Sequence, residues 1–291
     1  MDYFSINKQG LFGYLSESLK LRKYLKRCSY DILHAHYGLS ALAAWMARRK
    51  DKLVVSFMGD DIVGTNKSDG SVTALSKAMA RFNIFMAGHF YDHVIVKSEE
   101  MRKWLRLSNV SLIPNGVALD EFKTVSKTDA RYRLGLRPND KIVIFVSNPS
   151  RAEKNIILAQ MAVAQLDDRE VRLVAVYDQP RDRLPMYYSA ADVLILTSFH
   201  EGSPNVIKEA MACNCPIVST DVGDVKWVLG DTEGCFMTSF DAEDVAAKIH
   251  LAVEFSRNKT RTEGRKRILE LGLDSESIAK KIIDVYKKVI D

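Results

Sequence analysis

Short runs rich in β-branched residues alternate with helix-like segments along the chain, and this alternation most limits its possible folds. Because the runs are almost continuously apolar, they predict strands covered on both faces, as in parallel sheets with helical crossovers. Nine strands are expected, at Asp31–His36, Leu53–Met58, His93–Lys97, Val110–Ile113, Lys141–Ser147, Val171–Tyr177, Asp192–Thr197, Pro216–Thr220 and Cys235–Met237. The pattern predicts an α/β protein with two Rossmann-like, doubly wound parallel sheets.

The 291 residues are enough for two domains. A turn signal at Pro114-Asn115-Gly116 and the polar stretch Lys123–Asp140 separate the two sets of strands. We expect an N-terminal domain over 1–122, a C-terminal domain over 123–274 and a last helix over 275–291. That helix could pack on either half, including back on the N-terminal domain. The first half opens with a helix over Leu11–Arg27 and offers only Tyr3–Ile6 as an earlier strand, so its sheet is expected to be incomplete.

Composition excludes several classes of protein. Apolar residues make up 47% of the chain and charged residues 27%, which is typical of a globular protein and not of a disordered or collagen-like one. No run of about 18 apolar residues predicts a transmembrane helix, and the N-terminus lacks the regions of a signal peptide. The four cysteines show no disulfide or zinc framework. A reduced, cytoplasmic protein is expected.

Positive charge is concentrated in the first half of the chain. Residues 1–122 hold 17 Lys and Arg against 12 Asp and Glu, whereas residues 123–291 hold 25 of each. Five cations crowd the end of the first helical segment: Lys20, Arg22, Lys23, Lys26 and Arg27. Leu15, Leu19 and Tyr24 or Leu25 recur there at helical spacing.

Two interpretations of this helix stay open. It lies on an anionic membrane, with the protein peripheral on the inner membrane face, or it is a solvated helix that covers a sheet. No nucleic-acid motif is present, so nucleic acid is not an expected partner.

Ligands in open α/β sheets bind beyond the carboxyl ends of the strands. After the strand Asp192–Thr197 the chain reads Ser-Phe-His-Glu-Gly-Ser-Pro-Asn and enters a helix. Ser203 is a good N-cap and Pro204 suits the first helical position, which would leave the amides of Asn205 and Val206 free. Free amides at a helix N-terminus bind anions, and the diphosphate of a sugar nucleotide is the expected ligand. A plainly capped helix is the alternative.

Two carboxylates frame that turn, Glu201 before the helix and Glu209 within it. Eight helical residues span up to roughly 12 Å, which does not suit two carboxylates acting on one anomeric carbon, as in glycosidases. The spacing fits two parts of one long ligand. Glu201 would contact sugar hydroxyls or steady developing charge, and Glu209 would accept the two hydroxyls of a ribose. A structural role for Glu209 in its helix is the alternative.

Two cations follow the strand Lys141–Ser147. Arg151 and Lys154 precede a predicted helix over Lys154–Leu166, where the helix dipole disfavours positive charge unless an anion compensates. A diphosphate leaving group would compensate them, because its charge rises as its bond to the sugar breaks. Two ordinary solvated cations are the alternative.

Polar side chains also end two strands of the first half. His34 and His36 are two residues apart on one strand and therefore point to one face. Asp60 lies in the polar turn that follows Leu53–Met58. No metal site is expected, because neither this histidine pair nor the cysteines supply a full ligand set.

With these residues in view, the chain resembles glycosyltransferase family 4, whose GT-B fold has two Rossmann-like domains facing each other across a cleft. The strongest likeness is EGSPNVIKEAMACNCPIVSTDVGD, from Glu201 to Asp224, which looks like the family's E-x7-E motif and its flanks. VSLIPNGVALDEF resembles the inter-domain connector, and SRAEKN resembles the segment with the Arg and Lys for the donor diphosphate. YDILHAHYG and VVSFMGDD resemble strands on the acceptor side.

The resemblance implies a retaining, metal-independent hexosyltransferase that moves a sugar from a UDP- or GDP-sugar to an acceptor hydroxyl in polysaccharide or glycolipid biosynthesis. The nucleotide sugar is a substrate, and no cofactor is implied. The acceptor would be a saccharide or a lipid-linked saccharide. In the mechanism usually proposed for the family, the acceptor attacks from the front face and the leaving phosphate oxygen takes its proton.

The resemblance also assigns roles to residues of this sequence. Glu201, as the catalytic residue, would lie beside the donor sugar, and Glu209 would bind the ribose. Arg151 and Lys154 would bind the diphosphate. Backbone amides over Ser203, Pro204, Asn205 and Val206 would hold the phosphate or the sugar. His36 and Asp60 are the candidates on the acceptor side.

Two departures from the family pattern leave alternatives open. Family members commonly begin with a strand, a glycine-containing loop and a helix that this sequence lacks, so the N-terminal domain is expected to be truncated at its start. Met58 stands where many relatives carry a histidine that reaches the sugar. The alternatives are an inactive or truncated fragment that only binds nucleotide sugar, and a same-fold epimerase or phosphorylase.

Overall fold

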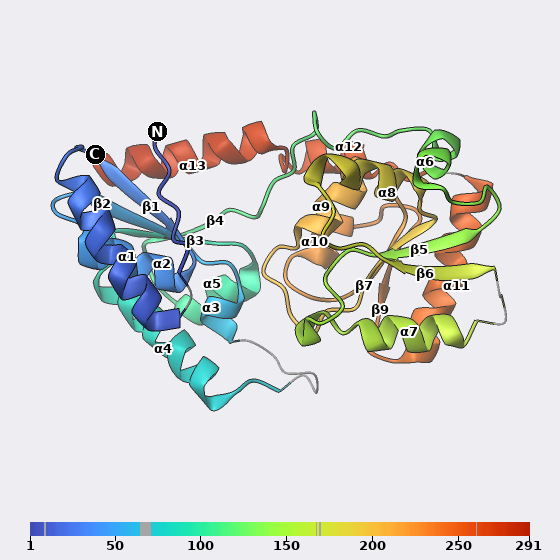
Figure 1. The fold of residues 1–291 in the computed structure, drawn as a ribbon, viewed down its shortest axis with the longest axis horizontal. Helices are drawn as coiled ribbons and strands as arrows, with labels where there is room; N and C mark the ends of the chain where they lie inside the picture. The colour runs from blue at the N-terminus through green and yellow to red at the C-terminus, as the bar shows by residue number, and fades with distance from the viewer. Residues whose placement is uncertain (9, 65–70, 167, 169, 260) are drawn as a thin grey trace. The chain divides into compact units, whose positions relative to one another are not determined.

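The computed structural model describes residues 1–8, 10–64, 71–166, 168, 170–259 and 261–291. They form two compact units, each built around its own parallel sheet (Figure 1). Of the described residues, the first unit contains 1–64, Val72–Pro114 and Ala279–Asp291, and the second contains Ser71 and Asn115–Ile278. The predicted α/β class with two parallel sheets is confirmed. The domain limits 1–122, 123–274 and 275–291 stay a prediction.

The first sheet has four parallel strands in the order β1-β2-β3-β4. Their bounds are Ile32–His36, Lys52–Ser56, His93–Val96 and Val110–Leu112. The helices of this part of the chain are α1 Gly10–Leu25, α2 Gly38–Ala47, α3 Asp60–Val63, α4 Ala74–His89 and α5 Glu99–Leu105. The strand proposed at Tyr3–Ile6 is wrong, because these residues have no regular structure and pair with no strand.

The two faces of the first sheet differ in polarity. One face supplies apolar side chains to a core, among them Leu53 and Val55 of β2. The opposite face carries His34, which lies against the last helix, α13 (Ser275–Ile290). The Nδ1 atom of His34 is 2.6 Å from the Tyr286 hydroxyl, and its Nε2 atom is 2.8 Å from the hydroxyl of Ser56. Burial lowers the pKa of His34 to about 3, so this ring is neutral at pH 7.

Helix α1 buries a stripe that only partly overlaps the apolar residues noted at helical spacing. Ser18, Leu21 and Leu25 are buried at spacings of three and four, whereas Leu19 is 69% exposed. Leu19 lies off this buried stripe because it is rotated by about one residue, or 100°, from Ser18. All five cations of this segment are exposed, and Lys20 also forms an ion pair of 2.7 Å with Glu17.

The second sheet has five parallel strands in the order β6-β5-β7-β8-β9. They run over β5 Lys141–Phe145, β6 Val171–Ala175, β7 Val193–Leu196, β8 Ile217–Thr220 and β9 Cys235–Thr238. All nine predicted strands are therefore present. The helices are α6 Lys127–Leu134, η1 Ala152–Lys154, α7 Ile156–Ala164, η2 Arg181–Arg183, α8 Leu184–Ala190, α9 Asn205–Ala212, α10 Val225–Leu229, α11 Ala242–Asn258 and α12 Gly264–Glu270.

Strand β5 lies at the point where the chain reverses its direction across the second sheet. It pairs with β6 on one side and with β7 on the other, so the connections after β5 and after β7 diverge from their shared border. Helices α7 and α11 pack on one face of the sheet through a core that includes Val143, Ile195 and Val218. In open α/β sheets this switch point leaves a crevice beyond the carboxyl ends of the strands.

A buried carboxylate, Asp192, ties the start of β7 to three other elements. It accepts hydrogen bonds from the Ile142 amide of β5 at 2.6 Å and from the Arg131 guanidinium of α6 at 2.8 Å. The Lys127 ammonium of α6 lies 2.5 Å from it, and the Ser256 hydroxyl of α11 lies 3.2 Å from it. Each oxygen of Asp192 therefore has two partners.

Removing the Asp192 carboxylate should destabilise the second unit. The change Asp192→Ala leaves the two cations of α6 buried or half-buried without their partner, which costs about 3–5 kcal/mol of the free energy of unfolding. Urea unfolding followed by circular dichroism measures this loss, with Asp231→Ala at an exposed position as the control. Equal stability of the two variants would contradict the structural role of Asp192.

Candidate functional site

The loops that leave β5 and β7 meet at the switch point of the second sheet. The Lys154 ammonium, after β5, lies 2.5 Å from Oε1 of Glu201, after β7. The Ser198 hydroxyl donates to the same carboxylate oxygen at 2.7 Å. The amide of Phe199 donates to the carbonyl of Glu153 at 3.0 Å and joins the two loops through their backbones. Two residues predicted to serve adjacent parts of one donor are thus in direct contact.

The local setting of Arg151 and Lys154 differs from the prediction. Lys154 ends a 3₁₀ turn over Ala152–Lys154, Arg151 occupies its N-terminal cap position, and helix α7 begins only at Ile156. Asn155, which has a left-handed backbone with φ 51°, separates the 3₁₀ turn from helix α7. Arg151 is half-exposed and donates to Glu153 at 2.6 Å. The protein therefore supplies a carboxylate for each cation, Glu153 for Arg151 and Glu201 for Lys154. The diphosphate contacts of both cations stay a prediction.

Ser203 does not cap helix α9, contrary to the prediction. The helix begins at Asn205, and Pro204 occupies the cap position with no side-chain hydrogen bond. The Ser203 hydroxyl instead donates to Asp224 at 2.7 Å and accepts from the Asn115 amide at 2.9 Å. A contact with residues distant in sequence has replaced the local cap.

The first amides of α9 are open as a result. In the part of the chain that the structure describes, the amides of Asn205 and Val206 have no acceptor. Asn205 is exposed and Val206 half-buried, so solvent or a ligand can reach this end of the helix. Unpaired amides and the positive end of the helix dipole favour an anion at this place.

Glu209 lies one turn further into α9 and is only 5% exposed. Its Oε2 accepts from the Tyr188 hydroxyl at 2.7 Å, and its Oε1 is 3.6 Å from the Arg181 guanidinium. Burial raises the pKa of Glu209 above its usual range, and the Tyr188 hydrogen bond and Arg181 oppose this shift. The Oε1 atom retains capacity to accept hydrogen bonds, as contact with a diol requires.

A buried ion pair beneath the α9 loop was missed by the sequence reasoning. The Lys208 side chain is fully buried, and its ammonium contacts the two Asp224 oxygens at 2.6 and 2.7 Å. Its third contact is the Ser203 hydroxyl at 2.8 Å. Burial lowers the pKa of Lys208, which the adjacent Asp224 opposes. A lysine within the apolar stripe of a helix was the signal that could have revealed it.

The structure of the first unit agrees with only part of what the sequence predicted for the polar residues that follow its strands. His34 and His36 share one face, as expected, with ring centroids 4.4 Å apart. His36 is exposed at the end of β1, and Asp60 is half-buried at the start of α3. The neighbouring Asp61, which was not singled out, is the buried carboxylate of this turn.

Asp61 organises the ends of the first two strands. It accepts hydrogen bonds from the backbone amides of Met58, Gly59 and Gly38 at 3.0–3.1 Å. Burial raises its pKa to about 6, against the effect of these backbone hydrogen bonds. Asp61 therefore shapes the turns after β1 and β2, where His36 and Asp60 lie.

Among the described residues, no group of three or more His, Cys, Asp or Glu is placed to hold a metal ion. Cys213 and Cys215 are buried, and burial raises the pKa of both thiols. None of the helices in the described ranges has the length and apolar character that a membrane crossing needs.

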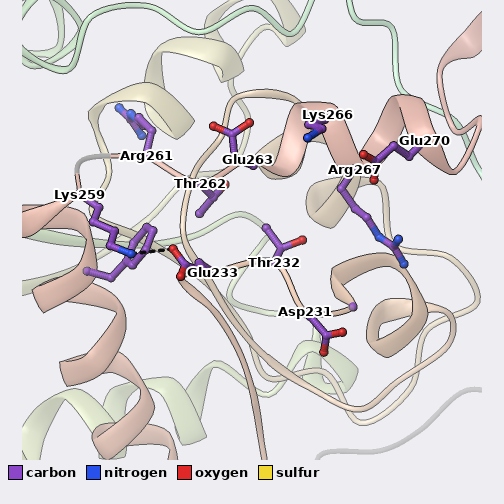
Figure 2. A pocket seen from close by; sticks show the side chains of 12 residues that line it. Asp231, Thr232, Glu233, Lys259, Arg261, Thr262, Glu263, Lys266, Arg267 and Glu270 are labelled. Atoms are coloured by element: carbon purple, nitrogen blue, oxygen red, sulfur yellow. Dashed lines mark hydrogen bonds and ion pairs between the residues drawn. The ribbon is translucent and has the colours of Figure 1, made fainter.

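A separate pocket of about 690 Å³ lies in the second unit among α10, α11 and α12 (Figure 2). It is lined by four acidic and four basic side chains, and Figure 2 shows Lys259 reaching Glu233, at 2.7 Å. The loop Gly230–Gly234 that borders it precedes β9, which places it away from the carboxyl ends of the strands. It contains none of the predicted site residues, and its balanced charge does not favour a diphosphate.

Comparisons with known proteins agree with this arrangement. The family model described as Glycosyltransferase Family 4 matches residues 3–121, and the model described as Glycosyl transferases group 1 matches residues 159–254. The putative teichuronic acid biosynthesis glycosyltransferase TuaC of Bacillus subtilis is 26% identical over 241 residues, covering 75% of this chain and 60% of TuaC. The D-inositol 3-phosphate glycosyltransferase 2 of Catenulispora acidiphila is 24% identical, covering 99% of this chain and 79% of that protein.

Solved structures share the fold at lower identity. Sucrose-phosphate synthase from Thermosynechococcus elongatus has a TM-score of 0.82 at 21% identity, covering 98% of this chain and 80% of its own. Anabaena HepE, in complex with UDP-glucose, has a TM-score of 0.75 at 20% identity, covering 96% of this chain and 84% of its own. Both units of the chain are thus matched by one kind of protein. The chain belongs to the family 4 glycosyltransferases and has their GT-B fold.

Proposed function

We propose that the chain is a retaining, metal-independent hexosyltransferase that moves a sugar from a UDP- or GDP-sugar to an acceptor hydroxyl. The acceptor is a saccharide or a lipid-linked saccharide, and the product belongs to a polysaccharide or a glycolipid. The relatives named above are glycosyltransferases, and HepE has been solved with UDP-glucose, which supports a nucleotide sugar as the donor. The donor is a substrate in this proposal, and no cofactor takes part.

The observation that carries the proposal is the contact between Lys154 and Glu201 at the switch point, on the loop that leads to the open amides of α9. A diphosphate at the amides of Asn205 and Val206 would need a cation nearby as its bond to the sugar breaks. Lys154 provides that cation, and Arg151 on the same turn provides a second. The donor sugar would then lie beside Glu201.

The reaction needs few groups from the protein. The bond between the anomeric carbon and the phosphate oxygen breaks while a bond to the acceptor oxygen forms on the same face of the sugar. The leaving phosphate oxygen takes the proton of the acceptor hydroxyl, so atoms and charges balance without an enzyme base. In the transition state, Glu201 stabilises the positive charge that develops on the sugar, and Lys154 stabilises the negative charge that develops on the leaving diphosphate. Glu209 anchors the ribose at the other end of the donor.

Glu209→Gln should weaken nucleotide binding, because a neutral amide oxygen accepts hydrogen bonds from the ribose hydroxyls more weakly than the charged carboxylate does. Thermal unfolding with UDP, GDP and ADP measures this effect. A ligand at about 100 times its dissociation constant stabilises the native state by about 2.7 kcal/mol. We expect one nucleotide to stabilise the unchanged protein, and its effect to fall in the variant. The exposed Glu254→Gln on α11 serves as the control, and equal stabilisation of both variants would refute the ribose role.

Glu201→Gln should separate transfer from binding. The variant keeps a hydrogen-bond acceptor for Ser198 but loses the charge beside the donor sugar. We expect nucleotide affinity within about twofold of the unchanged protein and hydrolysis of the nucleotide sugar slowed by on the order of 10². Release of nucleoside diphosphate from UDP-glucose or GDP-mannose is the assay, with Glu233→Gln as the control. Undiminished hydrolysis would rule out a catalytic role for Glu201.

The proposal extends to a cytoplasmic location with peripheral contact to an anionic membrane. Helix α1 presents exposed cations in its last turns together with exposed Phe12 and Leu19. Helix α4 contributes no acidic residue and exposes Phe82 and Phe85. Cations combined with aromatic and aliphatic side chains suit the surface of an anionic bilayer.

Replacing Lys23, Lys26 and Arg27 by Gln should therefore reduce binding to vesicles that contain phosphatidylglycerol. Each cation near the surface contributes about 1 kcal/mol, so three changes should lower the partition coefficient by about 100-fold. Sedimentation with vesicles is the measurement, and Lys226, Arg257 and Lys266 changed to Gln form the matched control. If the unchanged protein does not bind these vesicles, the membrane proposal is wrong.

A further inference from the structure

The Ser203 hydroxyl is held away from a helix that its sequence suits it to cap. Serine followed by proline is typical of an N-cap and a first helical position. A hydroxyl in that role accepts a hydrogen bond from the amide two or three residues later, which here means Asn205 or Val206. In the structure it accepts from Lys208 and from the Asn115 amide, and it donates to Asp224. Its one donor and both of its acceptor sites are therefore occupied.

The network around this hydroxyl is closed and buried. All three N–H donors of Lys208 are used, two on Asp224 and one on Ser203. Asp224 stands at the cap position of α10, yet its carboxylate makes no cap there, and its contacts among the described residues are with Lys208 and Ser203. The amide group of Asn115 adds a bond to the Ser203 carbonyl at 2.9 Å. The ion pair therefore acts on the Ser203 loop and not on its own helix end.

The backbone next to Asp224 also packs against the loop that carries Ser203. Gly223 has φ +59°, and a Cβ atom there would lie 2.5 Å from the Gly202 carbonyl oxygen and 2.8 Å from that of Glu201. The turn after β8 thus packs backbone to backbone against the residues just before Ser203. The Lys208–Asp224 pair holds the side chain of the loop, and Gly223 supports its main chain.

We propose that Lys208 and Asp224 are positioning residues that keep the N-terminus of α9 uncapped, so that its first amides stay open for the donor diphosphate. Without the pair, the Ser203 hydroxyl is free to turn onto Asn205 or Val206 and to compete with the phosphate for their N–H groups. The inference rests on the proposed function for the identity of the anion. The competition between side chain and ligand can be tested on its own.

The test removes both charges together, because removing one would leave the other buried without a partner. The double variant Lys208→Met with Asp224→Ala frees the Ser203 hydroxyl. A triple variant adds Ser203→Ala, which cannot cap, and the single Ser203→Ala provides its reference. The exposed pair Lys259 and Glu233, changed to Met and Ala, is the matched control. Calorimetry then measures the affinity for whichever of UDP, GDP and ADP the unchanged protein binds, and for the matching nucleoside.

We expect the double variant to bind the nucleoside diphosphate about fivefold more weakly, which corresponds to displacing a cap of ordinary strength. Its affinity for the nucleoside should not change. The triple variant should return to within about twofold of Ser203→Ala. A merely structural role predicts no such rescue. An unaffected double variant, or a triple variant as weak as the double, would overturn the inference.

Amide hydrogen exchange of Asn205 and Val206, followed by NMR, gives a readout that needs no ligand. These amides should exchange quickly in the unchanged protein, at least about tenfold more slowly in the double variant, and quickly again in the triple variant. Equal exchange in all three would refute the capping competition. If none of the nucleotides binds the unchanged protein, the proposed donor site fails, while the exchange experiment still decides whether Lys208 and Asp224 keep the helix end open.

Discussion

The second unit depends on what the Asp192 carboxylate does at the amino ends of its strands. Asp192 immediately precedes β7 and accepts from an amide of β5, so it fixes these two neighbours relative to each other. The loops that carry Lys154 and Glu201 leave the other ends of the same two strands. A shift between β5 and β7 would therefore move one charge of the site away from the other. The buried carboxylate at one end of the sheet is a condition for the ion pair at the opposite end.

The candidate site balances its own charges. Arg151 is paired with Glu153, Lys154 with Glu201, and Lys208 with Asp224, while Arg181 lies between Glu121 and Glu209. An arriving diphosphate does not meet a bare cluster of cations. In the proposed mechanism, the diphosphate would replace Glu201 at Lys154 and Glu153 at Arg151, while the buried Lys208–Asp224 pair would stay in place. Under that proposal, binding of the anionic part of the donor would free the Glu201 carboxylate to accept hydrogen bonds from the sugar.

The strands could be predicted from the sequence because burial on both faces of a parallel sheet leaves an almost continuous apolar run. The ends of the helices were harder to predict from the sequence. Ser203 has every local feature of an N-cap, but its hydroxyl is hydrogen-bonded to Asp224 and Asn115, which are 21 and 88 positions away in the sequence. No local sequence pattern reveals these contacts. Lys154 was assigned to a helix that begins two residues later, because Asn155 adopts a left-handed backbone. Asp60 attracted notice as a polar residue after a strand, whereas its neighbour Asp61 is the one that the backbone amides surround.

The hydrogen-bonded attachment of α13 to the first sheet has a consequence for how that helix can be altered. Apolar contacts tolerate sliding, because one hydrophobic side chain can replace another in the same space. The chain from Tyr286 through His34 to Ser56 has no such tolerance, since each atom in it has one suitable partner. Inserting a single residue into α13 ahead of Tyr286 would turn its hydroxyl by about 100° around the helix axis. The contact with the sheet therefore fixes the rotation of α13 about its own axis. Insertions or deletions in α13 ahead of Tyr286 preserve this contact only when they add or remove whole helical turns.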